Sequence, residues 1–236
     1  MRIALWGCCV VQLFSTLQSL LGMQHSFIQA IADQLKEPLP GQAAQYRMAH
    51  VVRQQSVQAP PGARQAGVLA LFYPYQSDWH LVFIERQPHH GQDRHAGQIS
   101  FPGGKFEDSD ASLEETALRE TEEEVGVPVD TIEVLGKLTE LYIPVSNFQV
   151  HPYVGFATSR PAFVPDTEEV SEILEVPFRH LAQPATRRKT NLQLATNITL
   201  KGVPYFDVEG KILWGATAMM VSELLAVAER TGLVSS

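Results

Sequence analysis

The chain contains 236 residues, of which 44% are hydrophobic and 19% charged, and its formal net charge is −8. These proportions are typical of a globular protein with one sizeable core and argue against a disordered or fibrous chain. The acidic balance argues against binding nucleic acids by general electrostatic attraction, so a polyanionic ligand would need bound cations or a local cluster of Arg and Lys.

The first 22 residues admit three interpretations: a translated leader ahead of a start at Met23, an extra helix, or a signal for export. The segment partly resembles a signal peptide, but its apolar run is short and no small-x-small cleavage site follows. No apolar stretch reaches the roughly 20 residues that cross a membrane. Cys8 and Cys9 are the only cysteines, so the rest of the chain can form neither a disulfide nor a Cys-based zinc site. We therefore expect a cytoplasmic protein without a membrane partner.

Helices and strands are expected to alternate from residue 23 onward. Residues 23–36 carry apolar side chains at helical spacing and predict a helix, and residues 38–62, rich in proline and glutamine, predict an extended connector. The apolar run Gly67–Tyr73 predicts a strand buried on both faces, with Trp79–Ile84 as its hairpin partner. Further predicted elements are a helix at 111–125 capped by Asp110 or Ser112, strands at 131–141, 150–157 and 172–177, a hairpin of Tyr205–Val208 and Lys211–Trp214, and a closing helix at about 216–230.

This order of elements predicts an α/β fold. Strands interspersed with a few helices favour one mixed β-sheet with helices on both of its faces. We expect one main domain over residues 63–232, preceded by the helix and connector of residues 23–62. No internal repeat and no second large domain are evident.

The predicted helix at 111–125 carries a concentration of carboxylates. At about 100° per residue, Glu120, Glu123 and Glu124 fall within an arc of about 100°, apart from the apolar stripe that would dock on the sheet. Like charges at this spacing repel one another, and hard cations such as Mg²⁺ or Mn²⁺ would relieve that repulsion. A Glu-rich solvated helix is the competing interpretation. Gly103 and Gly104, one short loop upstream, favour the metal site because glycine lets the backbone approach a ligand closely.

The segment from Gly104 through Arg119–Val127 resembles the box of the Nudix hydrolase superfamily, G-x5-E-x7-R-E-U-x-E-E-x-G-U. The half written R-E-x-x-E-E-x-G matches fully. The spacing from Gly104 to Arg119 is one residue longer than the box, and Ala111 stands where the first Glu belongs, so either Asp110 or Glu107 is the candidate substitute.

Within the superfamily, the chain resembles the coenzyme A pyrophosphatases. The segment His95–Gly104 is similar to their G-x3-F-P-G-G signature, and Asn147–Pro152 and Trp214–Ala218 are also similar. The resemblance implies an α/β/α sandwich with a mixed sheet and a loop-helix-loop catalytic box. It also implies a pyrophosphohydrolase that cleaves coenzyme A or acyl-coenzyme A to 3′,5′-ADP and 4′-phosphopantetheine or its acyl form.

The resemblance assigns provisional roles to single residues. Mg²⁺ or Mn²⁺ is expected on Glu120, Glu124 and Glu123, with the Gly104 carbonyl completing the site, and Glu120, Glu123 and Arg119 are expected to be catalytic. Substrate contacts are expected from His95, Gly97, Gly103 and Arg86. The expected partner is a small coenzyme A-like nucleotide, and a homodimer is left open. For the general base, the candidates are Glu120 or one of Glu168, Glu169 and Glu172 on a later loop.

Rival functions remain open at the level of sequence. A Nudix hydrolase acting on ADP-ribose or NADH and a non-catalytic nucleotide sensor are the main alternatives. A zinc site at His89, His90 and His95 is not favoured, because neither cysteines nor a helical H-x-x-x-H spacing accompany these residues. The basic run Arg187–Lys189 is expected to be a solvated loop rather than a contact for a 3′-phosphate.

Overall fold

A computed structural model of the chain describes residues 26–53, 58–88, 95–193 and 198–234. Residues 1–22, to which the three N-terminal interpretations apply, and His89 and His90 of the zinc hypothesis lie outside the described residues. Residues 26–35 form the predicted first helix. The ring centroid of its Phe27 lies 5.7 Å from that of Phe72 and 5.8 Å from that of Phe178. Among the described residues, no helix has the length and apolar character needed to span a membrane.

The main sheet has eight strands and is mixed, as predicted. Its central path runs β3-β2-β1-β7-β5, while β4 and β6 pair with β1 and β7, and β8 pairs with β2. The β1–β7 pair is parallel and the other pairs are antiparallel. The strands are β1 (Arg64–Tyr75), β2 (Asp78–Arg86), β3 (Ile99–Ser100), β4 (Gly103–Lys105), β5 (Glu133–Lys137), β6 (Leu141–Ile143), β7 (Phe148–Phe156) and β8 (Val170–Pro177).

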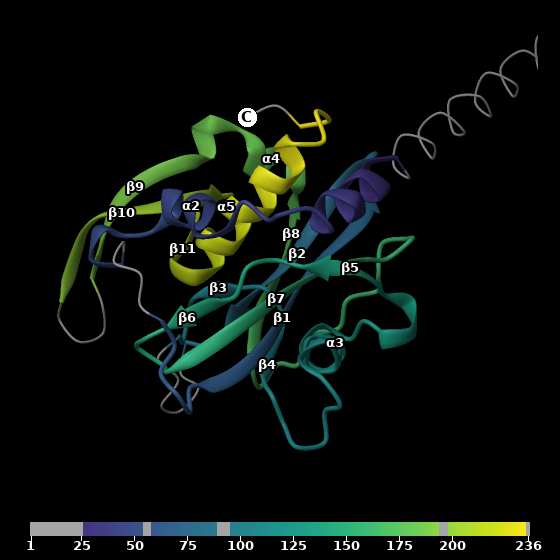
Figure 1. Cartoon of the computed structure of the whole chain (residues 1–236), viewed down its shortest axis with the longest axis horizontal. Coiled ribbons are helices and arrows are strands. Elements are labelled where there is room, and N and C mark those ends of the chain that lie inside the picture. The colour runs from purple at the N-terminus through teal and green to yellow at the C-terminus, as the bar shows by residue number, and fades with distance from the viewer. Residues whose placement is uncertain (1–25, 54–57, 89–94, 194–197, 235–236) are drawn as a thin grey trace, which may run out of the picture.

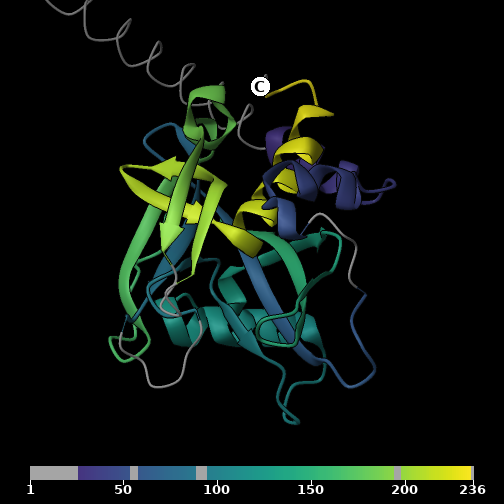
Figure 2. The ribbon, with the colours of Figure 1, turned by 90° about the vertical axis from the view of Figure 1, so that its left-hand side faces the viewer.

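Alternation along β1 builds a separate core on each face of this sheet. Ala70 and Phe72 belong to one cluster, while Leu69, Leu71 and Tyr73 belong to the other. The second cluster lies under α3 (Leu113–Val125), and the first lies under residues 26–35, α4 (Phe178–Ala182) and α5 (Gly215–Glu229). Figures 1 and 2 show α3 on one side of the sheet and α5 on the other. This is the predicted sandwich.

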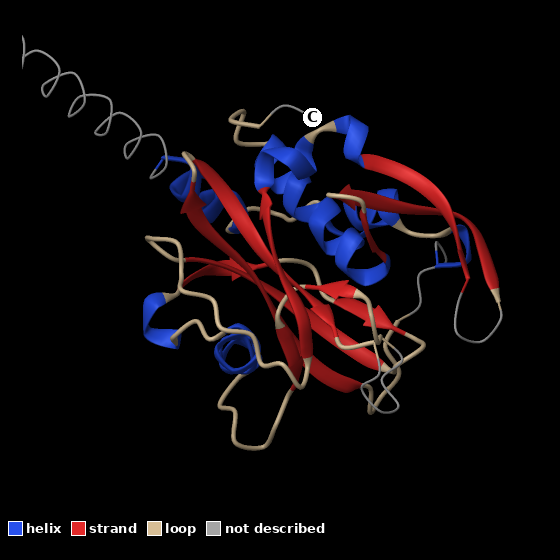
Figure 3. Cartoon of the chain, turned by 180° about the vertical axis from the view of Figure 1, so that it is seen from behind, coloured by secondary structure: helices blue, strands red, loops and turns tan. Residues whose placement is uncertain are grey.

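A second, three-stranded sheet was not predicted. It has the order β11-β10-β9, formed by β9 (Arg187–Gln193), β10 (Thr199–Val208) and β11 (Lys211–Trp214). The expected hairpin is confirmed as β10–β11, but the basic run expected in a loop lies in strand β9. The sequence pattern did not predict this strand because β9 is an edge strand whose side chains, including the charged ones, are mostly exposed. Figure 3 shows this sheet beside α5.

The predicted boundaries need two further corrections. The connector expected to be extended contains α2 (Gly41–Gln45) and 3₁₀ turns at Tyr46–Met48 and Val51–Arg53. The strand expected at 131–141 is divided into β5 and β6.

Both corrected segments converge on Glu223, a fully buried carboxylate in α5. Glu223 accepts hydrogen bonds from the Gly41 N–H (3.0 Å), from the Gln45 side chain (2.9 Å) and from the N–H and hydroxyl of Thr139. A buried carboxylate is tolerated when several donors surround it. Glu223 therefore fastens α2 and the β5–β6 connection to α5, which explains why neither segment is an extended strand.

We expect Glu223→Ala to lower the free energy of unfolding by at least about 3 kcal/mol, because each buried donor left unsatisfied costs about 1–3 kcal/mol. Urea denaturation followed by circular dichroism measures the loss. Glu122→Ala, which removes an exposed carboxylate from α3, is the matched control and should change stability by no more than about 0.5 kcal/mol. Equal stability of the two variants would show that Glu223 does not anchor these segments.

Candidate active site

Helix α3 begins and ends where its sequence dictates. Ser112 is the N-cap, its hydroxyl accepting from the Glu115 N–H at 3.1 Å, while the Glu115 carboxylate accepts from the Ala111 N–H at 2.6 Å. This reciprocal arrangement resembles a capping box. Gly126 ends the helix in the left-handed region with φ of 71°. The prediction is thus confirmed with Ser112 as the cap and a start two residues later than expected.

The helix docks closely on β1 because Gly67 has no side chain. A Cβ at Gly67 would lie 2.3 Å from the Leu113 carbonyl oxygen and 2.9 Å from the Ala117 nitrogen. Thr116, Ala117, Thr121 and Val125 are buried in this contact, and so is Glu124. The close approach brings one acidic edge of α3 against β4, the strand paired with β1 at Gly67.

Glu124 is held between three elements of the fold. Its side chain is 3% exposed, and its carboxylate accepts from the Gly103 N–H at 2.7 Å and from Arg86 at 3.1 Å. Burial raises the pKa of the Glu124 carboxyl to about 8, although the Gly103 N–H and the Arg86 charge oppose that rise. Glu124 is therefore a buried acid positioned by the end of β2 and by the Gly103–Gly104 backbone.

Glu120 lies one turn earlier, directly against Gly104. A Cβ at Gly104 would lie 2.3–2.4 Å from the Glu120 carboxylate atoms, so only glycine leaves room for this contact. Burial raises the pKa of Glu120, against the lowering influence of Arg119. The nearby carboxylates of Glu123 and Glu169 also raise this pKa.

Glu169 is the member of the later acidic loop that reaches this cluster. Its charge acts on both Glu120 and Glu124, and its carboxylate lies 3.9 Å from Arg86. Glu172, predicted on the same loop, instead lies in strand β8 and pairs with Lys211 at 2.8 Å. The structure therefore favours Glu169 over its neighbours as an acidic group at the site, a choice that composition alone did not allow.

Arg119 joins helix α3 to the loop before it. Its guanidinium donates to the buried Asp110 carboxylate from Nε (2.8 Å) and Nη2 (3.1 Å), and it pairs with Glu123 at 2.9 Å and with Glu120 at 3.1 Å. Of Asp110 and Glu107, the two substitutes that the sequence offered for the first Glu of the motif, Asp110 is the one that Arg119 contacts. The hydrogen bonds from Arg119 hold the pKa of Asp110 well below its usual range.

The predicted site residues are thus only partly brought together. Glu123 is 57% exposed and faces solvent beside Arg119, whereas Glu120 and Glu124 face the Gly103–Gly104 backbone. Among the described residues, no three His, Cys, Asp or Glu side chains converge as a preformed metal centre. The carboxylates of Glu120, Glu124 and Glu169 nevertheless offer oxygen ligands, which are the type that hard divalent cations prefer.

Three of the expected substrate-binding residues, Arg86, His95 and Gly97, lie at or beside the end of β2, whereas Gly103 opens β4. The Gly97 N–H donates to the Arg86 carbonyl at 3.1 Å, and the Arg86 N–H donates to the Gln98 carbonyl at 3.0 Å. His95 contacts the Gln98 side chain at 3.2 Å. These bonds fasten the turn that carries His95 and Gly97 beside Arg86. The basic run of β9 lies on the other side of the main sheet from α3 (Figure 1).

Comparisons with known proteins identify the family of this fold. The NUDIX domain model matches residues 63–196. The Uncharacterized Nudix hydrolase NudL of Pectobacterium atrosepticum is 37% identical over 138 residues, covering 58% of this chain and 70% of that protein. NudL of Yersinia enterocolitica is 38% identical over 144 residues, covering 61% and 71%. A solved MutT/nudix family protein from Enterococcus faecalis aligns with a TM-score of 0.47 and 16% identity, covering 79% of this chain and 73% of that chain.

We expect Asp110→Asn to destabilise the protein at pH 7 by about 1–3 kcal/mol, because Arg119 would lose its buried charged acceptor. A carboxyl with a depressed native pKa contributes stability above its unfolded pKa of about 3.9, and that contribution is lost as the pH falls. The difference between wild type and variant should therefore shrink below about pH 4. Urea denaturation from pH 7 to pH 3 checks this. A difference that stays constant over the whole range would contradict the assigned ion pair.

Proposed function

This chain belongs to the NUDIX family, and from that premise we propose that it is a metal-dependent pyrophosphohydrolase of coenzyme A or acyl-coenzyme A. The products would be 3′,5′-ADP and 4′-phosphopantetheine or its acyl form. Family membership makes the chain a Nudix hydrolase, and such enzymes generally use divalent cations. The substrate and the identity of the cation are parts of the proposal.

The observation that carries the proposal is the placement of Glu120 and Glu124 against one stretch of backbone. Glu120 contacts Gly104, and Glu124 accepts from the Gly103 N–H, so both carboxylates lie at the start of β4. We assign Mg²⁺ or Mn²⁺ to Glu120, Glu124 and the Gly104 carbonyl, with Glu123 at the solvent side. When bound, the cation neutralises the diphosphate charge and lowers the pKa of a bound water.

The chain's own residues supply positioning and proton transfer. Arg86 lies between Glu124 and Glu169, so its guanidinium is placed to bind a phosphate oxygen once a cation offsets those carboxylates. Arg119 orients Glu120 and Glu123 through its ion pairs, while Asp110 fixes Arg119. Glu120 or Glu169 would accept the proton from the attacking water.

The choice of coenzyme A rests on the segment His95–Gly104. Its resemblance to the coenzyme A pyrophosphatase signature is supported by a contiguous placement: the His95–Gln98 turn is bonded to Arg86, and Gly103 is bonded to Glu124. We therefore propose His95, Gly97, Gly103 and Arg86 as substrate contacts. ADP-ribose and NADH share the same diphosphate chemistry and are the substrates to test in competition.

Product analysis by mass spectrometry is the direct test of this function. The protein would be incubated with Mg²⁺ or Mn²⁺ and, separately, coenzyme A, acetyl-coenzyme A, ADP-ribose and NADH. We expect 3′,5′-ADP and 4′-phosphopantetheine from coenzyme A, with turnover at least about 100-fold lower in Glu120→Gln. Preferential cleavage of ADP-ribose or NADH would reject the substrate while keeping the reaction. Nucleotide binding without any cleavage would favour a non-catalytic sensor.

Substitutions at two paired glycines, Gly104 and Gly67, distinguish an effect on catalysis from an effect on folding. In Gly104→Ala the three atoms nearest to the new methyl group all belong to the flexible end of Glu120, so we expect turnover to fall at least about tenfold with stability close to wild type. In Gly67→Ala, the partner position across β1 and β4, the methyl group meets the α3 backbone. We expect that variant to lose about 2 kcal/mol or more of stability.

Steady-state kinetics and thermal unfolding of both glycine variants distinguish the two effects. If Gly104→Ala retained full turnover, the contact between Gly104 and Glu120 would have no part in catalysis.

A further inference from the structure

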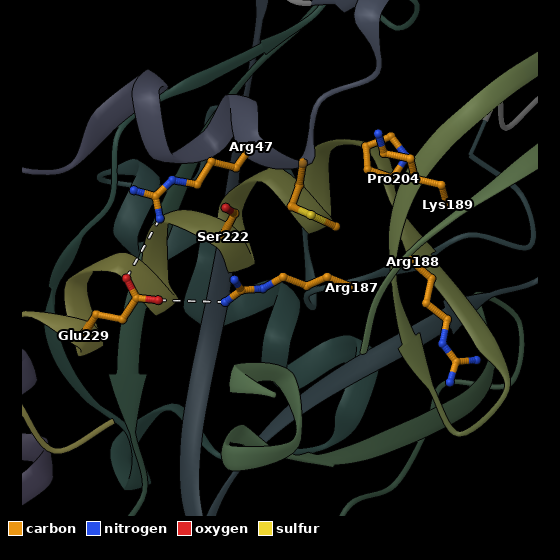
Figure 4. Close-up of a pocket in the computed structure, with 8 residues that line it drawn as sticks. Arg47, Arg187, Arg188, Lys189, Pro204, Ser222 and Glu229 are labelled. Atoms are coloured by element: carbon orange, nitrogen blue, oxygen red, sulfur yellow. Dashed lines mark ion pairs between the residues drawn. The ribbon is translucent and has the colours of Figure 1, made fainter. Parts of the chain in front are cut away.

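A cavity of about 170 Å³ lies between the Tyr46–Met48 turn, the second sheet and α5. Its wall includes Arg47, Arg187, Lys189, Ser222 and Glu229, and Figure 4 shows these side chains. The proposed active site does not use any of them. Four of the eight residues that line the cavity are cationic, the fourth being Arg188, in a chain whose formal net charge is −8.

The register of β9 explains which of its basic residues serve this cavity. Arg187 and Lys189 pair with Phe206 and Pro204, and Phe206 belongs to the core under α5. Alternate residues of a strand face opposite sides, so Arg187 and Lys189 share the face toward α5. Arg188, which also borders the cavity, faces the other way and forms an ion pair with Asp207; Figure 4 shows its side chain pointing away from Glu229.

The cationic groups of the cavity are incompletely neutralised. Arg47 and Arg187 both approach Glu229, at 3.9 Å and 3.8 Å, which is longer than a hydrogen bond. Within the described parts of the chain, no hydrogen bond is found from either guanidinium, nor any ion pair of Lys189. The charge of Arg188 is paired with Asp207, so the three remaining positive charges face one carboxylate, Glu229. The guanidiniums of Arg47 and Arg187 retain donors suited to a bidentate oxyanion.

The cavity is separate from the proposed catalytic site. Met48, in its wall, belongs to the core cluster on the α5 side of the main sheet, whereas α3 packs on the cluster of the opposite side. Figure 2 shows the same separation, with the teal α3 and the yellow α5 on opposite sides. A ligand in the cavity would therefore not compete for Glu120 or Glu124.

We propose that this cavity is a second binding site, specific for a small phosphate-bearing anion held by Arg47, Arg187 and Lys189. Its volume is below the roughly 300–1,000 Å³ of sites for drug-sized ligands, which suits a phosphate or diphosphate group rather than a whole dinucleotide. Glu229 holds the two arginines beside each other in the absence of the anion and competes with it when it binds. This role differs from that of a simple surface ion pair, because removing Glu229 should strengthen binding.

Isothermal titration calorimetry of the full chain with inorganic diphosphate tests the proposal, with EDTA present so that no metal site contributes. AMP, titrated separately, distinguishes a phosphate monoester from the inorganic anion. We expect Arg187→Ala to weaken binding at least about tenfold and Glu229→Gln to strengthen it about three- to tenfold. Arg179→Ala removes an exposed arginine of α4 that does not line the cavity, so its binding should stay within about twofold of wild type.

Two further variants keep the result interpretable. Lys189→Ala removes one charge without touching Glu229, so it should also weaken binding if Arg187→Ala fails to fold. Glu120→Gln should bind diphosphate like wild type, which separates this site from the catalytic one. The proposal is overturned if wild type binds neither anion at millimolar concentration, or if Arg187→Ala and Lys189→Ala bind as tightly as wild type. Weaker binding by Glu229→Gln would also overturn it.

Discussion

The closeness of α3 to the backbone of β1 and β4 is the constraint on which the site depends. Gly67 lets the helix touch β1, and the paired Gly104 leaves space for a carboxylate where any other residue would place a side chain. A helix standing even a side chain's width further away would separate Glu124 from the Gly103 N–H. The site is thus a consequence of backbone contact as much as of the acidic residues themselves, because the glycines set the distance across which those residues act.

Such contact brings like charges together in a partly buried place, which is unfavourable unless cations are nearby. The chain supplies two cationic side chains, Arg86 and Arg119, from different elements. Arg86 comes from the sheet and reaches Glu124 and Glu169, whereas Arg119 comes from α3 itself and is fixed by Asp110. Two arginines do not neutralise every carboxylate of the cluster, and the pKa of Glu124 is raised mainly by burial and further by the charges of Glu120 and Glu169. This residual demand for positive charge is the physical basis for assigning a divalent cation.

Sequence patterns predicted the parts of the fold in which burial follows a regular period. The apolar run of β1, the β10–β11 hairpin and the stripe of α3 were all recognised this way. Strand β9 was not predicted because an edge strand exposes its residues. Helix α2 was not predicted because its burial depends on Glu223, which lies 178 residues beyond Gln45. At the site, spacing placed Glu120, Glu123 and Glu124 on one side of the helix, although Glu123 faces solvent in the structure. It could not choose between Asp110 and Glu107, or among the acidic residues of the later loop, because those contacts bridge segments with no shared periodicity.

Contacts between residues far apart in the sequence also connect the two sides of the molecule. Glu223 of α5 holds α2 and Thr139. Arg47, in the turn that follows α2, and Glu229, at the end of α5, line the basic cavity. The Thr139 segment leads into β6, which pairs with β7, and β7 pairs in parallel with β1, the strand under α3. An anion that drew Arg47 and Arg187 together would therefore act on a segment connected through buried hydrogen bonds to the central sheet. Because that connection passes through a close-packed core, the two sites are separated in space but share a common framework.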